Sequence, residues 1–178
     1  MTLRSLIVTA VLLASAQAQA VPCPDDLPVL FVVQDKSNSM WATPSASCTG
    51  CPTKWESSQV AVTNLAAAFS NRFRFGLQMY PRDATSFNCV AGTVRSPVPA
   101  DSLDIESAYA TYYPGGGTPT ATSLGEARTY LNGLHLVEPA YVLLITDGLP
   151  NCNSLLDPVT CGEMTTGCAS TSTCEARD

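Results

Sequence analysis

Short apolar runs alternate with segments of helical periodicity along the central part of this chain. Val29–Val33 and Tyr141–Ile145 are continuous apolar runs, which is the pattern of strands covered on both faces of a sheet. Glu56–Ser70 lies between them and carries apolar residues at the three- and four-residue spacing of an amphipathic helix. Strands that alternate with helices build a layered α/β architecture around a mainly parallel sheet. The sequence therefore predicts an α/β domain.

The other periodic segments predict two strands and two helices. Arg72–Tyr80 alternates apolar and polar residues, so we expect a strand with one better-buried face. A helix is expected from Thr118, its cap, to about Gly133, with a proline at the first helical position. Weaker patterns at Asn88–Arg95 and Asp101–Tyr109 predict an edge strand and a short helix. The inward stripes of the two longer helices are predicted to be Val62, Leu65, Ala66 and Phe69, and Ala121, Leu124, Ala127 and Leu131.

Three short segments in this pattern are rich in oxygen donors. They contribute two carboxylates and three hydroxyls, from Asp35, Ser37, Ser39, Thr118 and Asp147. In an open parallel sheet, ligands bind at the carboxyl ends of the strands, so both carboxylates are expected to converge on one crevice. Carboxylates and hydroxyls are hard ligands, which suit Mg²⁺, Mn²⁺ or Ca²⁺ rather than zinc or copper. The sequence therefore predicts a site for a divalent cation.

The order and composition of these segments resemble the von Willebrand factor A (vWA) domain family. The chain reads Asp-x-Ser-x-Ser after the first strand, Gly-Gly-Thr-Pro before a helix, and Thr-Asp-Gly after a later strand. The resemblance covers about residues 27–152. It implies a Rossmann-like, doubly wound sheet flanked by helices, incomplete at its C-terminal side, with a metal-ion-dependent adhesion site.

The resemblance also implies how this site would hold its metal. Ser37, Ser39 and Thr118 would contact the cation directly. Asp35 and Asp147 would often act through water. A cation held mainly by neutral hydroxyls stays under-neutralised and keeps a position open for an incoming ligand. We therefore expect a module that binds an Asp or Glu carboxylate of a protein partner through a divalent cation, with Mg²⁺ preferred over Mn²⁺ or Ca²⁺.

Two other functions stay open at this point. The same cation could serve a metal-dependent hydrolase as a Lewis acid, although such an enzyme needs a general base. His135 is the only histidine and lies on a helix-to-strand connection, where a surface position is expected. The chain could also be an inactive fragment of a larger adhesion or secreted protein. Gly115–Gly117 lacks the spacing of a nucleotide-binding loop, so nucleotide binding is not expected.

The first twenty residues have the composition of a secretory signal peptide. Arg4 precedes an apolar stretch from Leu6 to Ala14, and the segment ends in Ala18-Gln19-Ala20. This stretch is too short to span a bilayer, which needs about 20 apolar residues. Export is therefore expected, to a secreted, cell-surface or periplasmic location, with no membrane span in the remaining chain.

Charge excludes two classes of partner. Removing Arg4 with the signal peptide leaves 8 basic side chains against 15 acidic ones, a net charge near −7. The basic residues are scattered, which argues against nucleic-acid binding. The acidic excess argues against an anionic membrane surface. The 158 residues that follow the signal peptide suit one domain with its own core.

All eight cysteines follow the signal peptide, and an even number in an exported chain indicates disulfides. Cys48 and Cys51 are expected to close a tight loop. Cys152 is expected to pair mostly within the C-terminal group of Cys152, Cys161, Cys168 and Cys174.

The chain is divided into a signal peptide at 1–20, the vWA-like domain at 21–151 and a cysteine-rich tail at 152–178. Only 30 residues follow Gly148, and none of them forms a convincing apolar strand. The tail is therefore either a disulfide-stapled replacement for the missing half of the sheet or the remainder of a truncated domain. In both cases one flank of the strand before Asp147 is expected to be uncovered.

Overall fold

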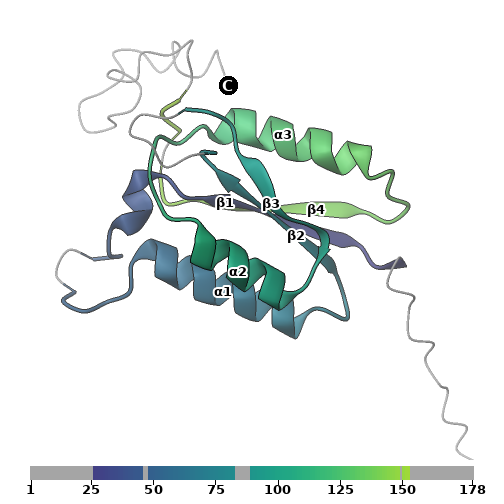
Figure 1. Ribbon diagram of the computed structural model, residues 1–178, viewed down its shortest axis with the longest axis horizontal. Coiled ribbons are helices and arrows are strands. Elements are labelled where there is room, and N and C mark those ends of the chain that lie inside the picture. Colours follow the sequence, from purple (N-terminus) through teal and green to yellow (C-terminus); the bar gives the residue numbers. More distant parts are fainter. Residues whose placement is uncertain (1–25, 46–47, 83–88, 149, 153–178) are drawn as a thin grey trace, which may run out of the picture.

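A four-stranded sheet runs through the middle of the molecule in the order β3-β2-β1-β4 (Figure 1). The computed structural model describes residues 26–45, 48–82, 89–148 and 150–152. Its central strand β1 (Val29–Asp35) pairs in parallel with β2 (Arg74–Tyr80) and with β4 (Ala140–Ile145). The fourth strand, β3 (Thr93–Ala100), is antiparallel to β2. The predicted mainly parallel α/β architecture is confirmed.

Helices cover both faces of this sheet. α1 (Lys54–Ala68) and α2 (Ser102–Thr111) lie on one face, and α3 (Thr120–Gly133) lies on the other (Figure 1). A short 3-10 helix, η2 (Asn38–Trp41), follows β1 and precedes the loop that leads to α1. The doubly wound arrangement expected from the resemblance is therefore present.

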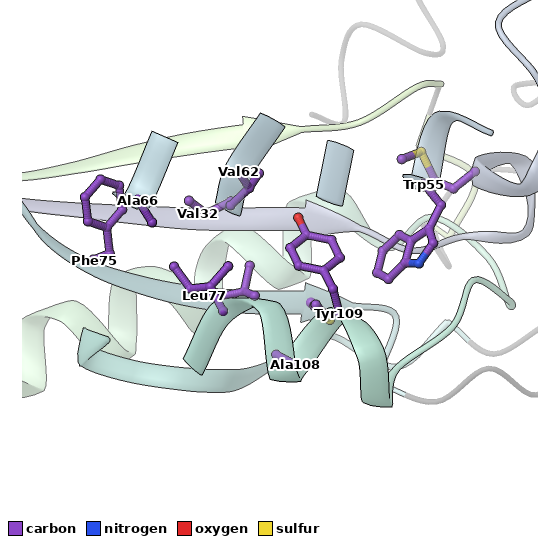
Figure 2. Close-up of a cluster of buried hydrophobic side chains, with 11 residues drawn as sticks. Val32, Trp55, Val62, Ala66, Phe75, Leu77, Ala108 and Tyr109 are labelled. Carbon is purple, nitrogen blue, oxygen red and sulfur yellow. The ribbon is translucent and has the colours of Figure 1, made fainter. Parts of the chain in front are cut away.

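Each face of the sheet has its own apolar core because side chains alternate along the strands. In β1, Phe31 packs toward α3, whereas Val32 packs toward α1 and α2. The same alternation in β2 places Phe75, Leu77 and Met79 in the core beneath α1 and α2, as predicted. Figure 2 shows that core, with the labelled side chains Val32, Trp55, Val62, Ala66, Phe75, Leu77, Ala108 and Tyr109.

α1 begins two residues before its predicted start because a capping box forms at its N-terminus. Thr53 Oγ1 accepts a hydrogen bond from the N–H of Glu56 at 3.1 Å, and Glu56 Oε2 accepts one from the N–H of Thr53 at 2.7 Å. Two donors that would otherwise lack partners are satisfied in this way. The helix also ends earlier, at Ala68, so the prediction that Phe69 faces inward is wrong and this side chain is exposed.

α3 differs from its prediction at its N-terminal end. Pro119 occupies the cap position, so the helix starts at Thr120 and Thr118 lies before it. Thr120 and Ser123 face inward on the first turns, and the prediction that Ala121 does so is wrong. The C-terminal end at Gly133 is as predicted.

β3 lies further along the chain than the predicted edge strand Asn88–Arg95. It starts at Thr93 and contains Pro97 and Pro99, which interrupt the apolar alternation that sequence reasoning follows. A proline has no N–H for a sheet hydrogen bond, and it is tolerated here because β3 pairs with β2 alone among the described strands.

β4 is the other edge of the sheet as described, and the prediction that it is buried on both faces is wrong. Tyr141 is 54% exposed, and Val142 and Leu144 are also exposed. The cause is position, because β4 pairs with β1 and with no second strand among the described residues. The expectation that its outer flank is uncovered holds for this part of the chain.

Two disulfides join described cysteines. Cys48 and Cys51 are bonded, as predicted. Cys152 is bonded to Cys89, so the prediction that Cys152 pairs within the C-terminal group is wrong. Cys89 follows β2, whose carboxyl end lies at the same edge of the sheet as that of β1, and sequence distance conceals this proximity.

The predicted signal peptide at 1–20 and nearly all of the tail at 152–178 lie outside the described residues. Within the described ranges, no helix has both the length and the apolar composition that crossing a membrane requires.

Candidate metal centre

The predicted ligands come from three segments that meet at the carboxyl edge of the parallel strands. Asp35 is the last residue of β1, and Asp147 lies two residues beyond the end of β4. The connection from α2 to α3 passes the same end of the sheet (Figure 1). Its glycines contact the first segment through two backbone hydrogen bonds, from the N–H of Gly115 to the carbonyl of Lys36 at 2.7 Å and from the N–H of Asn38 to the carbonyl of Gly116 at 3.1 Å.

Hydrogen bonds join four of the five predicted ligands directly. Ser37 Oγ and Ser39 Oγ are 3.0 Å apart, and Ser39 Oγ donates to Asp147 Oδ1 at 2.7 Å. The backbone N–H of Ser37 donates to Asp35 Oδ1 at 2.7 Å. Side chains 108 positions apart in the sequence therefore form one oxygen cluster.

Thr118, the fifth predicted ligand, is hydrogen-bonded through its backbone to Asn151, which is not part of this cluster. Its N–H donates to Asn151 Oδ1 at 2.8 Å, and its carbonyl accepts from the N–H of Asn151 at 3.4 Å. The prediction that Thr118 caps α3 is wrong, since Pro119 holds the cap position and α3 has no side-chain cap. The Thr118 side chain is therefore not used to cap the helix.

Burial decreases along the cluster from the sheet toward solvent. Asp35 is fully buried, Ser37 and Thr118 are nearly so, and Ser39 is exposed. Burial raises the pKa of the Asp35 carboxyl, although hydrogen bonds from the Ser37 backbone and from the hydroxyl of Thr146 act in the opposite direction. The nearby Asp147 carboxylate adds to the increase. The site is therefore buried at Asp35 and opens to solvent at Ser39.

Three solved structures have a similar arrangement of strands and helices. The vWF domain of the type V pili tip protein Mfa5 from Porphyromonas gingivalis matches with a TM-score of 0.52 and 20% identity, over 70% of this chain and 39% of that one. The VWA domain of SpRpn10 matches with a TM-score of 0.54 and 14% identity, over 70% of this chain and 61% of that one. The conserved hypothetical protein BatB from Bacteroides thetaiotaomicron matches with a TM-score of 0.52 and 14% identity, over 84% of this chain and 62% of that one.

The chain has a vWA-like fold. It matches no protein-family model and no curated protein sequence. It spans less than two thirds of the length of each of these three solved chains. The predicted resemblance is therefore confirmed at the level of the fold.

Two side chains of the vWA-like domain that the sequence did not single out lie beside Asp35. Thr146 Oγ1 donates to Asp35 Oδ2 at 2.7 Å. Burial raises the pKa of the Tyr80 phenol, and the Asp35 carboxylate raises it further. Tyr80 ends β2 and is paired in register with Asp35, so knowledge of the strand pairing was needed to find it. Thr146 stands within the Thr-Asp-Gly segment, which is a local signal.

Lys54 is a third side chain that sequence reasoning missed. Its Nζ lies 2.5 Å from Asp147 Oδ2 in a salt bridge across 93 positions of sequence. No local pattern could have indicated this pair, because Lys54 is the first residue of α1 and its partner follows β4.

The donor set of the vWA-like domain fits a hard divalent cation. Within the part of the chain that the structure describes, no three His, Cys, Asp or Glu side chains gather into a metal-binding group. Any cation here would depend on hydroxyl oxygens together with two carboxylates. Oxygen-only coordination suits Mg²⁺, Mn²⁺ or Ca²⁺ rather than zinc.

Proposed function

We propose that this vWA-like domain is an exported protein-binding module that engages an acidic side chain of its partner through Mg²⁺. A vWA-like fold supports a general role in protein interaction or adhesion. The observation that carries the finer proposal is the cluster of Asp35, Ser37, Ser39 and Asp147, which is hydrogen-bonded and reaches solvent at one end.

The ligand roles in this proposal are those that the resemblance to the vWA family implies. The hydroxyls of Ser37, Ser39 and Thr118 would bind the cation directly, and the two carboxylates would act through water. Three neutral ligands leave most of the positive charge uncompensated. A carboxylate from a partner protein supplies both the missing charge and a further oxygen, and Mg²⁺ readily exchanges a bound water for such a ligand.

The rim of the proposed site offers aromatic surface to a partner. Trp41 ends η2 and is 47% exposed, and Tyr113 on the connection toward α3 is 58% exposed. Trp41 Nε1 donates to the carbonyl of Pro114 at 3.1 Å, which fixes the indole against that connection. Exposed aromatic side chains of this kind are enriched at protein interfaces. We propose that this aromatic rim selects the partner protein and that the metal ion anchors the partner's carboxylate.

Binding rather than catalysis is favoured by the location of the single histidine. His135 follows the C-terminal end of α3, whereas Thr118 precedes its N-terminal end. A helix of 14 residues is about 21 Å long, so His135 is out of reach as a general base. A metal-dependent hydrolase is therefore the weaker alternative.

Two observations favour export. The described part of the chain holds two disulfides, which form and persist in oxidising compartments. The Mfa5 domain, which this chain resembles in fold, belongs to a pilus tip protein. Both agree with the secretory composition of residues 1–20.

Calorimetric titration with Mn²⁺ and Mg²⁺ tests the cation site. Ser39→Ala removes one proposed ligand and is expected to weaken Mn²⁺ binding at least tenfold. Ser70→Ala is the matched control, because Ser70 is an exposed serine just beyond α1 and hydrogen-bonds to Ala67. Wild-type protein that binds neither ion at millimolar concentration would contradict the proposal.

The open coordination position has its own test. Acetate is a minimal carboxylate, and it is expected to displace water from protein-bound Mn²⁺. The measurement is the water-proton relaxation rate of the Mn²⁺-loaded domain, which is expected to fall as acetate is added. A relaxation rate that acetate leaves unchanged would argue against a partner carboxylate at the metal.

A further inference from the structure

We infer that Lys54 acts as an internal cation that occupies Asp147 in the metal-free protein and must be displaced when a divalent cation binds. The inference rests on the proposed cation site and concerns how that site is regulated. It assigns to Lys54 the role of a competitor, so that metal binding is coupled to release of a side chain at the start of α1.

The contacts of Asp147 provide the first argument. One of its carboxylate oxygens accepts from Ser39 Oγ at 2.7 Å, and the other lies 2.5 Å from Lys54 Nζ. The Asp147 side chain is only 8% exposed, whereas that of Lys54 is 31% exposed. A cation that recruits Asp147 therefore meets a carboxylate whose two oxygens already have partners, and of the two charged groups the lysine is the one with access to solvent.

The position of Lys54 provides the second argument. It is the first residue of α1, where the positive end of the helix dipole disfavours a cation. Its placement is therefore not explained by the stability of α1, and the acidic group that it contacts belongs to the proposed metal site. Asp147 lies beyond the end of β4, on a separate element of the fold.

The backbone of Lys54 is held on both sides. Its N–H donates to the carbonyl of Ala42 at 2.9 Å, and Ala42 directly follows η2, the helix that contains Ser39. On the other side, the capping box of Thr53 and Glu56 fixes the start of α1. The backbone of Lys54 is therefore fixed, while its four-carbon side chain is flexible. The ammonium can move away from Asp147 without a change in the backbone.

The physical consequence is competition between like charges. An ammonium and a divalent cation that share one carboxylate repel each other, so the metal binds fully only when the Lys54 side chain turns toward solvent. In the metal-free protein the ammonium neutralises Asp147, in the same cluster as the buried Asp35. Lys54 therefore stabilises the empty site and lowers its affinity for metal.

Lys54→Met tests this inference, because methionine keeps much of the stem and removes the charge. The dissociation constant for Mn²⁺, measured by calorimetry, is expected to fall at least tenfold relative to wild type. The thermal midpoint in EDTA is expected to fall as well, since Asp147 loses its partner. Opposite effects on affinity and on metal-free stability distinguish a competitor from a residue that merely supports the structure.

Two further variants serve as controls. Lys54→Arg keeps a cation at this position and is expected to bind Mn²⁺ within about threefold of wild type. Arg128→Met makes the same change in net charge on α3, at an exposed position on the opposite face of the sheet, and is expected to leave the Mn²⁺ affinity unchanged.

Each outcome decides between the proposals. If wild type binds Mn²⁺ and Lys54→Met binds it equally or more weakly, the competitor role is wrong and the proposed function stands. If neither protein binds Mn²⁺, both proposals fail. If Lys54→Met binds Mn²⁺ and wild type does not, the competitor role of Lys54 is supported, but the proposed function of the native protein fails.

Discussion

Removing the disulfide between Cys89 and Cys152 is expected to cost far more stability than removing the one between Cys48 and Cys51. A cross-link stabilises a protein mainly by restricting its unfolded chain, and the effect grows with the length of the closed loop. The first pair is separated by 63 positions and the second by 3. The chain-entropy relation gives about 4 kcal/mol for the long loop and about 1.6 kcal/mol for the short one at 25 °C.

The long-range disulfide also supports the candidate metal centre. A Cβ placed on Gly117 would lie 2.5 Å from Cys152 Sγ and 3.2 Å from Cys89 Sγ, so the disulfide packs directly against the residue before Thr118. Cys152 also follows Asn151, which holds Thr118 through two hydrogen bonds. Loss of this disulfide is therefore expected to weaken Mn²⁺ binding in addition to its effect on stability.

The assay compares two double variants, Cys89→Ser with Cys152→Ser, and Cys48→Ser with Cys51→Ser. Urea unfolding gives the free energy of unfolding of each variant and of wild type, and calorimetry gives the dissociation constant for Mn²⁺. A difference of about 2 to 3 kcal/mol between the two double variants is expected. Equal losses of stability would refute the loop-length reasoning, and an unchanged Mn²⁺ affinity in the first variant would refute the role assigned to the disulfide at Thr118.

Three further substitutions test the site, the sheet and a helix end. Asp35→Asn is expected to abolish cation binding and to stabilise the metal-free protein at pH 7. Burial raises the pKa of this carboxyl above its ordinary value of 3.8, so its ionisation destabilises the fold as the pH rises through the raised pKa. Urea unfolding in EDTA at pH 4 and pH 7 checks this, and a variant less stable than wild type at pH 7 would contradict it. Gly76→Ala is expected to cost about 1 to 3 kcal/mol, since its Cβ would lie 2.6 Å from Val98 Cγ2 and 2.8 Å from Phe31 Cδ2; an unchanged thermal midpoint would show that the sheet relaxes freely. Thr53→Ala removes the cap of α1 and is expected to cost about 1 kcal/mol in urea unfolding, with Thr43→Ala in the preceding loop as the matched control.

The fold was predictable where local periodicity and burial agree. β1 and β2 lie where the apolar pattern predicts them, inside the sheet. The prediction that β2 has one better-buried face is wrong, because every residue from Phe75 to Tyr80 is buried. β4 has an equally apolar sequence and is exposed, since burial depends on a neighbour that sequence pattern cannot supply. β3 was displaced in the prediction because its prolines break the alternation while an edge position tolerates them.

The candidate site was also predictable only in part. Its oxygen donors occupy short segments with fixed spacing, and each segment is recognisable because it follows a strand or opens a helix. The groups that surround them come from elsewhere. Lys54, Tyr80 and Asn151 reach the site from α1, from β2 and from the chain beyond β4.

The sequence by itself determined the α/β class, the order of the elements and the chemical type of the cluster at the carboxyl edge. Those properties depend on residues that lie close together along the chain, where periodicity and side-chain chemistry act locally. The tertiary structure alone decided that Lys54 neutralises Asp147, that Cys152 pairs with Cys89, and that β4 is left exposed. Each of these depends on which distant segments become neighbours when the sheet assembles, and that choice is made by the packing of the whole domain.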